Sequence, residues 1–125
     1  FNQLKDNGIF LFDFWFAPAV IHQKPCIKIK SVASGNSTII RIAEPELLIL
    51  NNLVNVKYTF YELNHLLSKF STYEEIHPMR YFTIPELEYF ANTSGFQLLE
   101  AEEFLTSKNP SLDTWGVCLI LRKNG

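Results

Sequence analysis

The sequence has few of the residues and motifs that mark many functional classes. Its two cysteines, Cys26 and Cys118, are too few for a disulfide framework, so we expect a reducing, cytoplasmic compartment. Its five glycines never fall at G-x-G spacing, so no dinucleotide-binding or P-loop fingerprint is present. The G-x-S-x-G, H-E-x-x-H and C-x-x-C motifs are also absent, which excludes nucleophile-elbow hydrolases and zincins.

Charge and hydropathy argue against two kinds of partner. Eleven Lys and Arg against thirteen Asp and Glu give a formal charge of -2, which lacks the basic footprint of a nucleic-acid binder. No apolar run approaches the roughly 20 residues that span a bilayer, and the first residues do not resemble a signal peptide. We therefore expect neither nucleic acid nor a membrane as a partner.

The composition that is present predicts one domain, residues 1–125, with a substantial core. Of the 125 residues, 47% are hydrophobic and 19% are charged, and a chain of this size buries roughly two-thirds of its unfolded surface. Aromatic residues make up 14%, eleven of them Phe, which favours either a thick core or an aromatic-lined pocket. Because the first residue is Phe1 and not methionine, we expect a fragment, a processed chain or an excised piece of a longer protein.

The first sixteen residues predict an α/β arrangement. Residues 1–8 are typical of a last helical turn, with Gly8 in the left-handed position after the helix. The continuous apolar run of residues 9–12 leads into Asp13-Phe14-Trp15-Phe16, as in a strand covered on both faces. A helix, a glycine and a buried strand in this order belong to α/β folds.

Residues 26–62 predict an antiparallel β insertion within that domain. Apolar and basic residues alternate in 27–30, a turn follows at 34–37, and residues 38–42 resume as a strand. Residues 47–50 fit another short strand, and from Val54 the period of two is clean. Residues 65–71 fit either a helical turn or a loop, and 73–82 fit an extended strand interrupted by Pro78.

The end of the chain predicts a helix and two strands. Thr83 and Glu86 form a capping box with Pro85 in the first turn, and Gly95 ends the helix. The predicted buried stripe of this helix comprises Ile84, Leu87, Phe90 and Ala91. Residues 96–104 and 115–121 are predicted strands joined by a loop too short for a crossover helix, so they should pair antiparallel.

Two groups of residues are candidates for a site. Asp13 and Trp15 come at the end of the first predicted strand, and ligands of open α/β sheets bind outside the carboxyl ends of strands. In the alternative, Phe14 and Phe16 are core residues and Trp15 covers an edge.

The second group is Glu75, His77, Arg80 and Tyr81. On an extended segment Glu75 and His77 share a face, so the carboxylate can orient the imidazole as a general base or a substrate contact. The alternative is a surface ion pair beside a structural arginine. No metal site is expected, because the spacings of the histidines and cysteines fit no ligand pattern.

Three ordered segments in the second half of the chain carry a family signature. They are Glu75-x-His77-x-Met79-Arg80-Tyr81-Phe82-Thr83-x-x-Glu86-Leu87, then Gly95-Phe96, then Asp113-x-Trp115-x-Val117. Together they resemble the C-terminal half of class I S-adenosylmethionine-dependent methyltransferases of the small-molecule type. The opening Leu4-Lys5-x-x-Gly8-x-x-Leu11-Phe12-Asp13 resembles the step into their fifth strand, with Asn7-Gly8 in place of the usual paired glycines.

The resemblance implies a Rossmann-like sheet of strand order 3-2-1-4-5-7-6, in which strand 7 is antiparallel. Here strands 5, 6 and 7 would be residues 9–14, 97–104 and 115–121, and the antiparallel stretch would be a substrate-side insertion. The glycine-rich loop and the ribose-binding acid of the family belong to the half that this sequence lacks. No cofactor-contacting residue is therefore assigned, and S-adenosylmethionine would bind largely outside this chain.

The resemblance also implies a function for the intact enzyme, which is methyl transfer from a sulfonium to an N, O or C nucleophile of a small molecule. Such enzymes act mostly through proximity and orientation, with a base where the nucleophile carries a proton. The implied residues are Asp13 as a hydrogen-bonding group, Trp15 as an aromatic wall, His77 as catalytic base or orienter, Arg80 as an anion or carbonyl contact, and Tyr81 as a further substrate contact. For this chain alone we expect little or no activity and a homo-oligomer, with a homodimer through the exposed sheet edge as its candidate form.

Two other readings stay open from the sequence. One is a non-catalytic, ligand-binding α+β domain with a curved antiparallel sheet around an aromatic pocket. The other is a dimerising interaction module, because a fifth strand without its four predecessors has an unpaired edge and apolar faces. The continuous apolar run at residues 9–12 favours the methyltransferase, because such a strand needs cover on both faces.

Overall fold

The computed structural model describes residues 2–125, which divide into two compact units. Unit 1 joins the residues up to Lys24 with Tyr81–Gly125, and unit 2 is Pro25–Arg80. One strand, β5 (Lys69–Phe82), contributes to both units. Through β5 the hydrogen-bonded strand order of the seven strands is β2-β3-β4-β5-β1-β7-β6. The mixture of parallel and antiparallel pairs with two α-helices confirms the predicted α/β class.

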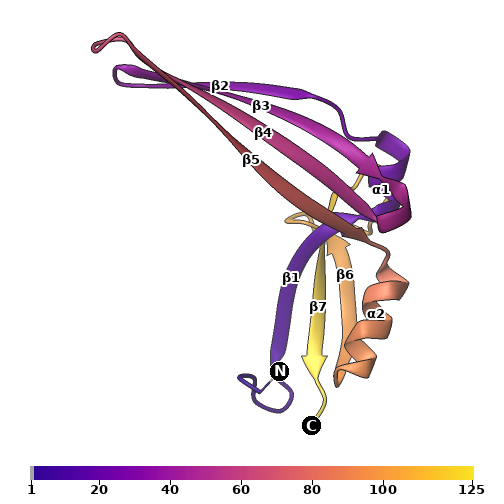
Figure 1. The fold of residues 1–125 in the computed structure, drawn as a ribbon. Helices are drawn as coiled ribbons and strands as arrows, with labels where there is room; N and C mark the ends of the chain where they lie inside the picture. The colour runs from indigo at the N-terminus through magenta and orange to yellow at the C-terminus, as the bar shows by residue number, and fades with distance from the viewer. Residues whose placement is uncertain (1) are drawn as a thin grey trace. The chain divides into compact units, whose positions relative to one another are not determined.

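Unit 1 is built on an antiparallel ladder (Figure 1). Its elements are β1 (Ile9–Phe16), α1 (Ala17–Gln23), α2 (Ile84–Thr93), β6 (Phe96–Glu103) and β7 (Gly116–Lys123). Strand β7 lies between β1 and β6 and runs antiparallel to both. The predicted order of the last three strands, with the final strand antiparallel in the middle, is therefore confirmed.

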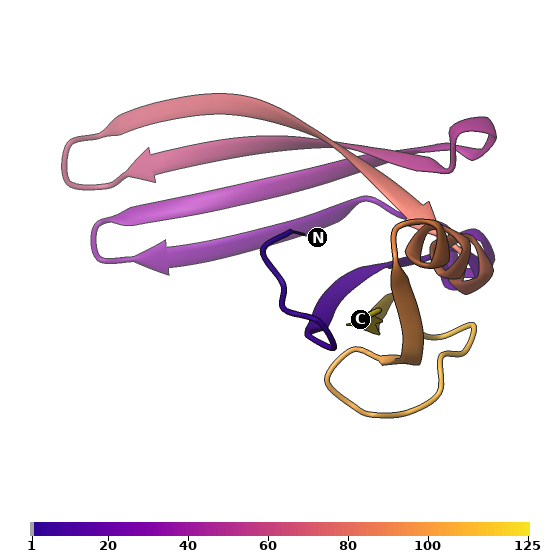
Figure 2. The ribbon, with the colours of Figure 1, turned by 90° about the horizontal axis from the view of Figure 1, so that it is seen from below.

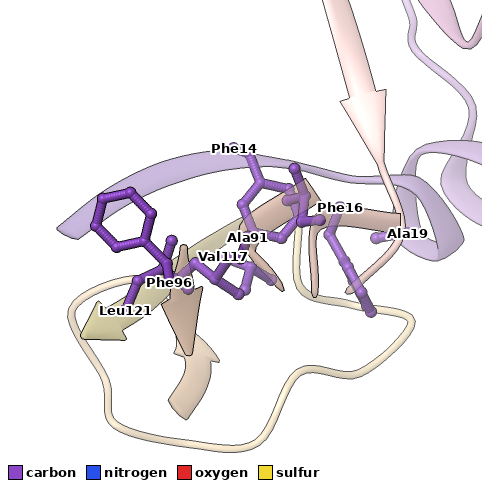
Figure 3. Packing of buried hydrophobic residues seen from close by; sticks show 9 residues of the cluster. Phe14, Phe16, Ala19, Ala91, Phe96, Val117 and Leu121 are labelled. Carbon is purple, nitrogen blue, oxygen red and sulfur yellow. The ribbon is translucent and has the colours of Figure 1, made fainter. Parts of the chain in front are cut away.

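The core of unit 1 lies on one face of this ladder (Figure 3). Phe14 and Phe16 of β1 share this face with Val117 of β7, which pairs in register with Phe14. Helix α2 contributes Leu87 and Ala91. The buried cluster comprises Phe14, Phe16, Ala19, Leu87, Ala91, Phe96, Val117, Leu119 and Leu121. Full burial of a valine, leucine or phenylalanine side chain in such a cluster stabilises a fold by roughly 1.5–3 kcal/mol.

Helix α2 begins and ends where the sequence predicts. The Thr83 hydroxyl accepts a hydrogen bond from the Glu86 backbone N–H at 3.3 Å, and Gly95 takes a φ of 85° just after the helix. Pro85 lies in the first turn, where its missing N–H costs nothing. The predicted buried stripe is wrong for one residue, because Phe90 is 43% exposed.

The predictions for the first residues are partly wrong. Turns and a bend precede β1 where a helical end was predicted, and Asn7, not Gly8, takes the left-handed conformation with a φ of 63°. Glycine is needed at position 8 for a different reason, because a Cβ there would lie 2.8 Å from the Lys5 carbonyl oxygen. Helix α1 was missed, although Pro18 at its first turn is a start signal.

Strand β1 is also less covered than predicted. Ile9 and Leu11 are 48% and 57% exposed, so the prediction that both faces of this segment are buried is wrong for the described residues. The cause is geometrical. Side chains alternate across a strand. The core cluster takes Phe14 and Phe16, with Phe12 packed against it, which leaves Ile9 and Leu11 on the other face.

Unit 2 is an antiparallel meander of four strands (Figure 2). Strands β2 (Lys28–Ser34), β3 (Ser37–Leu48) and β4 (Leu53–Asn64) pair in sequence with the first part of β5, and the 3-10 helix η1 (Ile49–Asn51) connects β3 to β4. The hairpin predicted at 34–37 is present. Residues 47–50 are shared between β3 and η1 and form no strand of their own.

Pro78 does not interrupt β5 as predicted. It lies in the strand opposite Asn55 of β4. Pairing of β5 with β1 is confined, in the described chain, to Tyr81 and Phe82. Position 78 is therefore on an edge of the unit 2 sheet, where a residue without an N–H is tolerated.

Candidate functional site

Asp13 and Trp15 lie on the face of β1 opposite the core of unit 1. Across β7 their register partners are Cys118 and Gly116. The pKa of the Cys118 thiol is raised, first by burial and then by the nearby carboxylates of Glu102 and Asp13. Strand β1 continues to Phe16, so Asp13 lies within the strand and not at its end as predicted.

Trp15 and Tyr81 are neighbours at the carboxyl ends of two parallel strand segments. They are register partners in the short pairing of β1 with β5. The Trp15 ring also packs edge-on against Trp115, with ring centroids 5.3 Å apart and an interplanar angle of 65°. The structure therefore brings together two of the predicted site residues within unit 1.

Tyr81 places a buried hydroxyl in unit 1. It is only 2% exposed, and its hydroxyl has no hydrogen-bond partner within residues 2–125. Burial raises the pKa of the phenol, so the hydroxyl stays neutral and can donate a hydrogen bond. An unpaired buried hydroxyl costs free energy, which makes this position a candidate for contact with a bound molecule.

The predicted pair of Glu75 and His77 is present in unit 2. The distance from His77 Nε2 to Glu75 Oε2 is 2.9 Å, and the side chains are about half exposed, at 48% and 51%. Because a carboxylate only accepts, Nε2 carries the proton of this hydrogen bond, and Nδ1 of the neutral ring is the free acceptor. The Tyr58 ring packs edge-on against the imidazole, with centroids 5.0 Å apart.

Arg80 does not share a face with His77. In the register of β4 with β5, His77 lies opposite Val56 and Arg80 lies opposite Leu53. Residues three apart on a strand point to opposite faces, so the two side chains leave β5 on opposite sides. The sequence alone does not show that His77 and Arg80 lie on opposite faces. That conclusion requires the strand to continue through Pro78, which the sequence does not predict.

The sequence interpretation missed Arg41. Its guanidinium carbon lies 5.3 Å from the centre of the Tyr58 ring, and its Nε is buried with no hydrogen-bond partner among the described residues. Arg41 is placed there by the register of β3 with β4, in which it lies opposite Phe60. The period of two along β4 predicts that Tyr58 and Phe60 share a face. Only the register of β3 with β4 shows that Arg41 lies on that face as well.

The described residues show neither a metal cluster nor a membrane span. Within residues 2–125 no group of three or more His, Cys, Asp or Glu side chains is arranged to hold a metal ion. None of the helices in that range has the length and apolar character needed to cross a membrane.

Comparisons with known proteins identify the fold. No protein-family model matches the sequence, and no curated protein matches it. Among solved structures, an S-adenosylmethionine-dependent methyltransferase from Clostridium acetobutylicum is similar with a TM-score of 0.78 and 16% identity, over 99% of this chain and 48% of that one. The sugar N-methyltransferase KedS8 from Streptoalloteichus is similar with a TM-score of 0.75 and 11% identity, over 99% of this chain and 45% of that one.

A third similar structure was solved with its cofactor. It is CalS10, an amino pentose methyltransferase from Micromonospora echinaspora with S-adenosylmethionine bound; the TM-score is 0.70 and the identity 11%, over 98% of this chain and 47% of that one. The chain therefore spans about half the length of the methyltransferases that it matches. It has the fold of one half of such a chain, which confirms the fold implied by the sequence resemblance.

Proposed function

We propose that the chain is the C-terminal, substrate-side part of an S-adenosylmethionine-dependent methyltransferase that acts on a small molecule. The observation that carries the proposal is the strand order β1-β7-β6 with an antiparallel β7, in a chain that matches methyltransferases over half of their length. The amino pentose and sugar methyltransferases among the similar structures support a small-molecule acceptor.

The free edge of β1 supports the same proposal. Within the described residues β1 pairs with β5 only at Trp15 and Phe16, so residues 9–14 have no strand partner on the side away from β7. In the sheet order of the family, strand 4 would pair at this edge. For this chain alone, we propose that a second copy pairs there and forms a homodimer.

S-adenosylmethionine supplies the methyl group in this proposal. The chain contains no G-x-G loop after a strand, so its own residues do not form the usual cradle for that cofactor, and we place the cofactor site largely outside them. A reducing, cytoplasmic location is part of the proposal and is supported by the free thiols of Cys26 and Cys118.

The residues of this chain act on the acceptor. We propose that Glu75 holds the imidazole of His77 so that Nδ1 takes the proton of the nucleophile. Arg80 contacts a carbonyl or an anionic group of the acceptor independently of His77, because its side chain leaves β5 on the other face. In unit 1, Asp13 accepts a hydrogen bond, Trp15 forms an aromatic wall and Tyr81 donates through its neutral hydroxyl.

The first test is calorimetric titration of the 125-residue chain with S-adenosylmethionine and S-adenosylhomocysteine. We expect no binding of either. Micromolar binding would assign the cofactor site to these residues and overturn the substrate-side assignment. Analytical ultracentrifugation of the same sample tests the homodimer, and a monomer at micromolar concentration would refute that part.

The second test reads the gene upstream of Phe1 and assays the protein that it encodes. We expect a strand followed by a glycine-rich loop, and methyl transfer by the intact protein. There, His77→Ala should lower kcat by about 10²–10⁴-fold, the usual contribution of a general base. His65→Ala is the matched control, because His65 lies at the turn after β4 and contacts Thr38 instead. Equal activity of the two variants would contradict the role of His77.

A further inference from the structure

We propose that one face of the unit 2 sheet binds a small molecule that carries a ring and an anionic group. This face, called the aromatic face below, presents Arg41, Tyr58, Phe60, Tyr73, Glu75 and His77. The inference deepens the proposed function, on which it rests, because it names the class of the acceptor substrate.

Strand register places these side chains, except His77, in two cross-strand rows on the same face, and His77 follows Glu75 by two residues and shares that face. In the first row, Lys30 of β2, Arg41 of β3, Phe60 of β4 and Tyr73 of β5 are successive partners. In the second row the partners are Lys28, Ala43, Tyr58 and Glu75. Directly paired residues point to the same face. Each row therefore begins with a lysine on β2 and crosses an aromatic ring on β4 before it reaches β5, and the first row has a second cation, Arg41, on β3.

The aromatic rings form a continuous surface. Phe60 and Tyr73 are stacked, with centroids 4.7 Å apart and an interplanar angle of 11°. Tyr58 lies 6.2 Å from Phe60 and contacts the His77 imidazole edge-on. Tyr73 is 46% exposed, so a ring of a ligand can stack on this surface without displacing a core residue.

Arg41 supplies the polar anchor. Its guanidinium carbon lies over the Tyr58 ring, 5.3 Å from the ring centre and within the range of a cation–π contact. Its Nε is buried and has no hydrogen-bond partner in the described chain. A carboxylate or a phosphate can accept from the two terminal nitrogens together, in the bidentate geometry that arginine favours, while the neighbouring Nε reports on the guanidinium from its buried position.

The charges on the face fix the orientation of the ligand. Lys28 and Lys30 add positive charge next to Arg41, whereas Glu75 lies two strands away and two residues further along, at about 12 Å from strand spacing and rise. Glu62, further along β4 on the same face, is also negative. An anion therefore sits at the β2–β3 side, and the body of the molecule extends over Tyr58 toward His77. A ring with one anionic substituent spans this distance.

The test is an NMR titration of the full ¹⁵N-labelled chain, because the Arg41 Nε–H gives its own signal. The probes are phenyl phosphate and benzoate, with phenol and inorganic phosphate as the ring-only and anion-only controls. We expect the Arg41 signal and the amides of Tyr58 and His77 to shift, with phenyl phosphate or benzoate binding at least tenfold more tightly than either control. The better of these two probes identifies the anionic group as phosphate or carboxylate.

Two substitutions and one control give the residue-level test. Arg41→Gln should weaken binding of the better probe by about 10-fold or more, as expected for loss of a charge-assisted hydrogen bond. Phe60→Leu should weaken it several-fold. Arg122→Gln changes an exposed arginine of β7 in unit 1 and should leave the affinity unchanged. An amide spectrum with the dispersion of the parent chain shows that each variant is folded.

Three results would overturn the proposal. They are phenol binding as tightly as the anionic probes, shifts of NMR signals that centre away from the aromatic face, and no binding of any probe at about 10 mM.

Failure of the proposed function is a separate outcome. If the probes bind through Arg41 but the intact protein transfers no methyl group, the site stands and the enzyme assignment fails. If the intact enzyme is active and Arg41→Gln leaves KM unchanged, the site fails and the enzyme assignment stands.

Discussion

Replacing Tyr81 with phenylalanine should stabilise the protein. The side chain is 2% exposed, and its hydroxyl finds no partner in residues 2–125, so folding removes the hydroxyl from water without compensation. Such a group costs roughly 1–3 kcal/mol, and the small void left by the missing oxygen offsets part of the gain. We expect Tyr81→Phe to raise the free energy of unfolding by about 1–2 kcal/mol, or Tm by about 4–8 °C for a chain of this length.

Urea denaturation at pH 7, followed by circular dichroism, measures this change. Burial raises the pKa of the phenol, so ionisation of Tyr81 does not contribute at that pH. Tyr89→Phe is the matched control, because Tyr89 lies on α2 with 65% of its surface exposed. The free energy of unfolding of that variant should stay within about 0.5 kcal/mol of the parent value. Destabilisation by Tyr81→Phe of 1 kcal/mol or more would refute the reasoning, since it would mean that the hydroxyl has a favourable partner.

The same variant separates stability from binding. If Tyr81 donates a hydrogen bond to the acceptor substrate, as proposed above, the phenylalanine variant of the intact enzyme binds that substrate less tightly while the folded state gains stability. A gain in stability together with a loss of substrate affinity is typical of substitutions at residues that serve function at a cost in stability. A variant with unchanged KM would remove Tyr81 from the proposed substrate contacts.

Three further predictions concern the unit 1 fold. Leu119→Ala should cost about 2–5 kcal/mol in urea denaturation, because Leu119 is fully buried, whereas no loss would contradict its place in the core. Thr83→Ala should cost about 0.5–2 kcal/mol by thermal unfolding, since it removes the cap of α2, and Thr83→Ser should restore most of it. Hydrogen bonds from the Thr106 and Thr114 hydroxyls lower the pKa of Glu103. The stability that this carboxylate provides is therefore full above its ordinary pKa and is lost as pH falls through the lower folded value. Glu103→Gln should flatten that acid dependence of the urea midpoint, and an unchanged dependence would refute the assignment.

Local signals in the sequence predicted much of the fold. Thr83 and Gly95 set the ends of α2 through a cap and a left-handed residue, both of which depend only on neighbours in the chain. The turn at 34–37 and the alternation from Val54 likewise gave strands of unit 2. Predictions failed where long-range packing decides, as at Ile9, whose apolar character indicates cover that the described residues do not provide.

The candidate site was predictable only in part, for a related reason. Glu75 and His77 pair because they are two residues apart on one strand, which the sequence shows directly. Arg41 joins them only through the register of three strands, and a shift by one residue would move it to the other face. The hydroxyl of Tyr81 gives no sequence signal, because its isolation depends on everything packed around it.

The edge-on pair of indoles has a consequence for spectroscopy. Trp15 and Trp115 are the two tryptophans of the sequence, and both belong to unit 1. Indole emission therefore reports directly on unit 1. The backbone N–H of Phe16 donates to the Trp115 carbonyl at 2.8 Å, so separation of the two rings marks release of the β6–β7 loop from β1. Comparing indole fluorescence with far-ultraviolet dichroism during denaturation thus shows whether the two units unfold together or in turn.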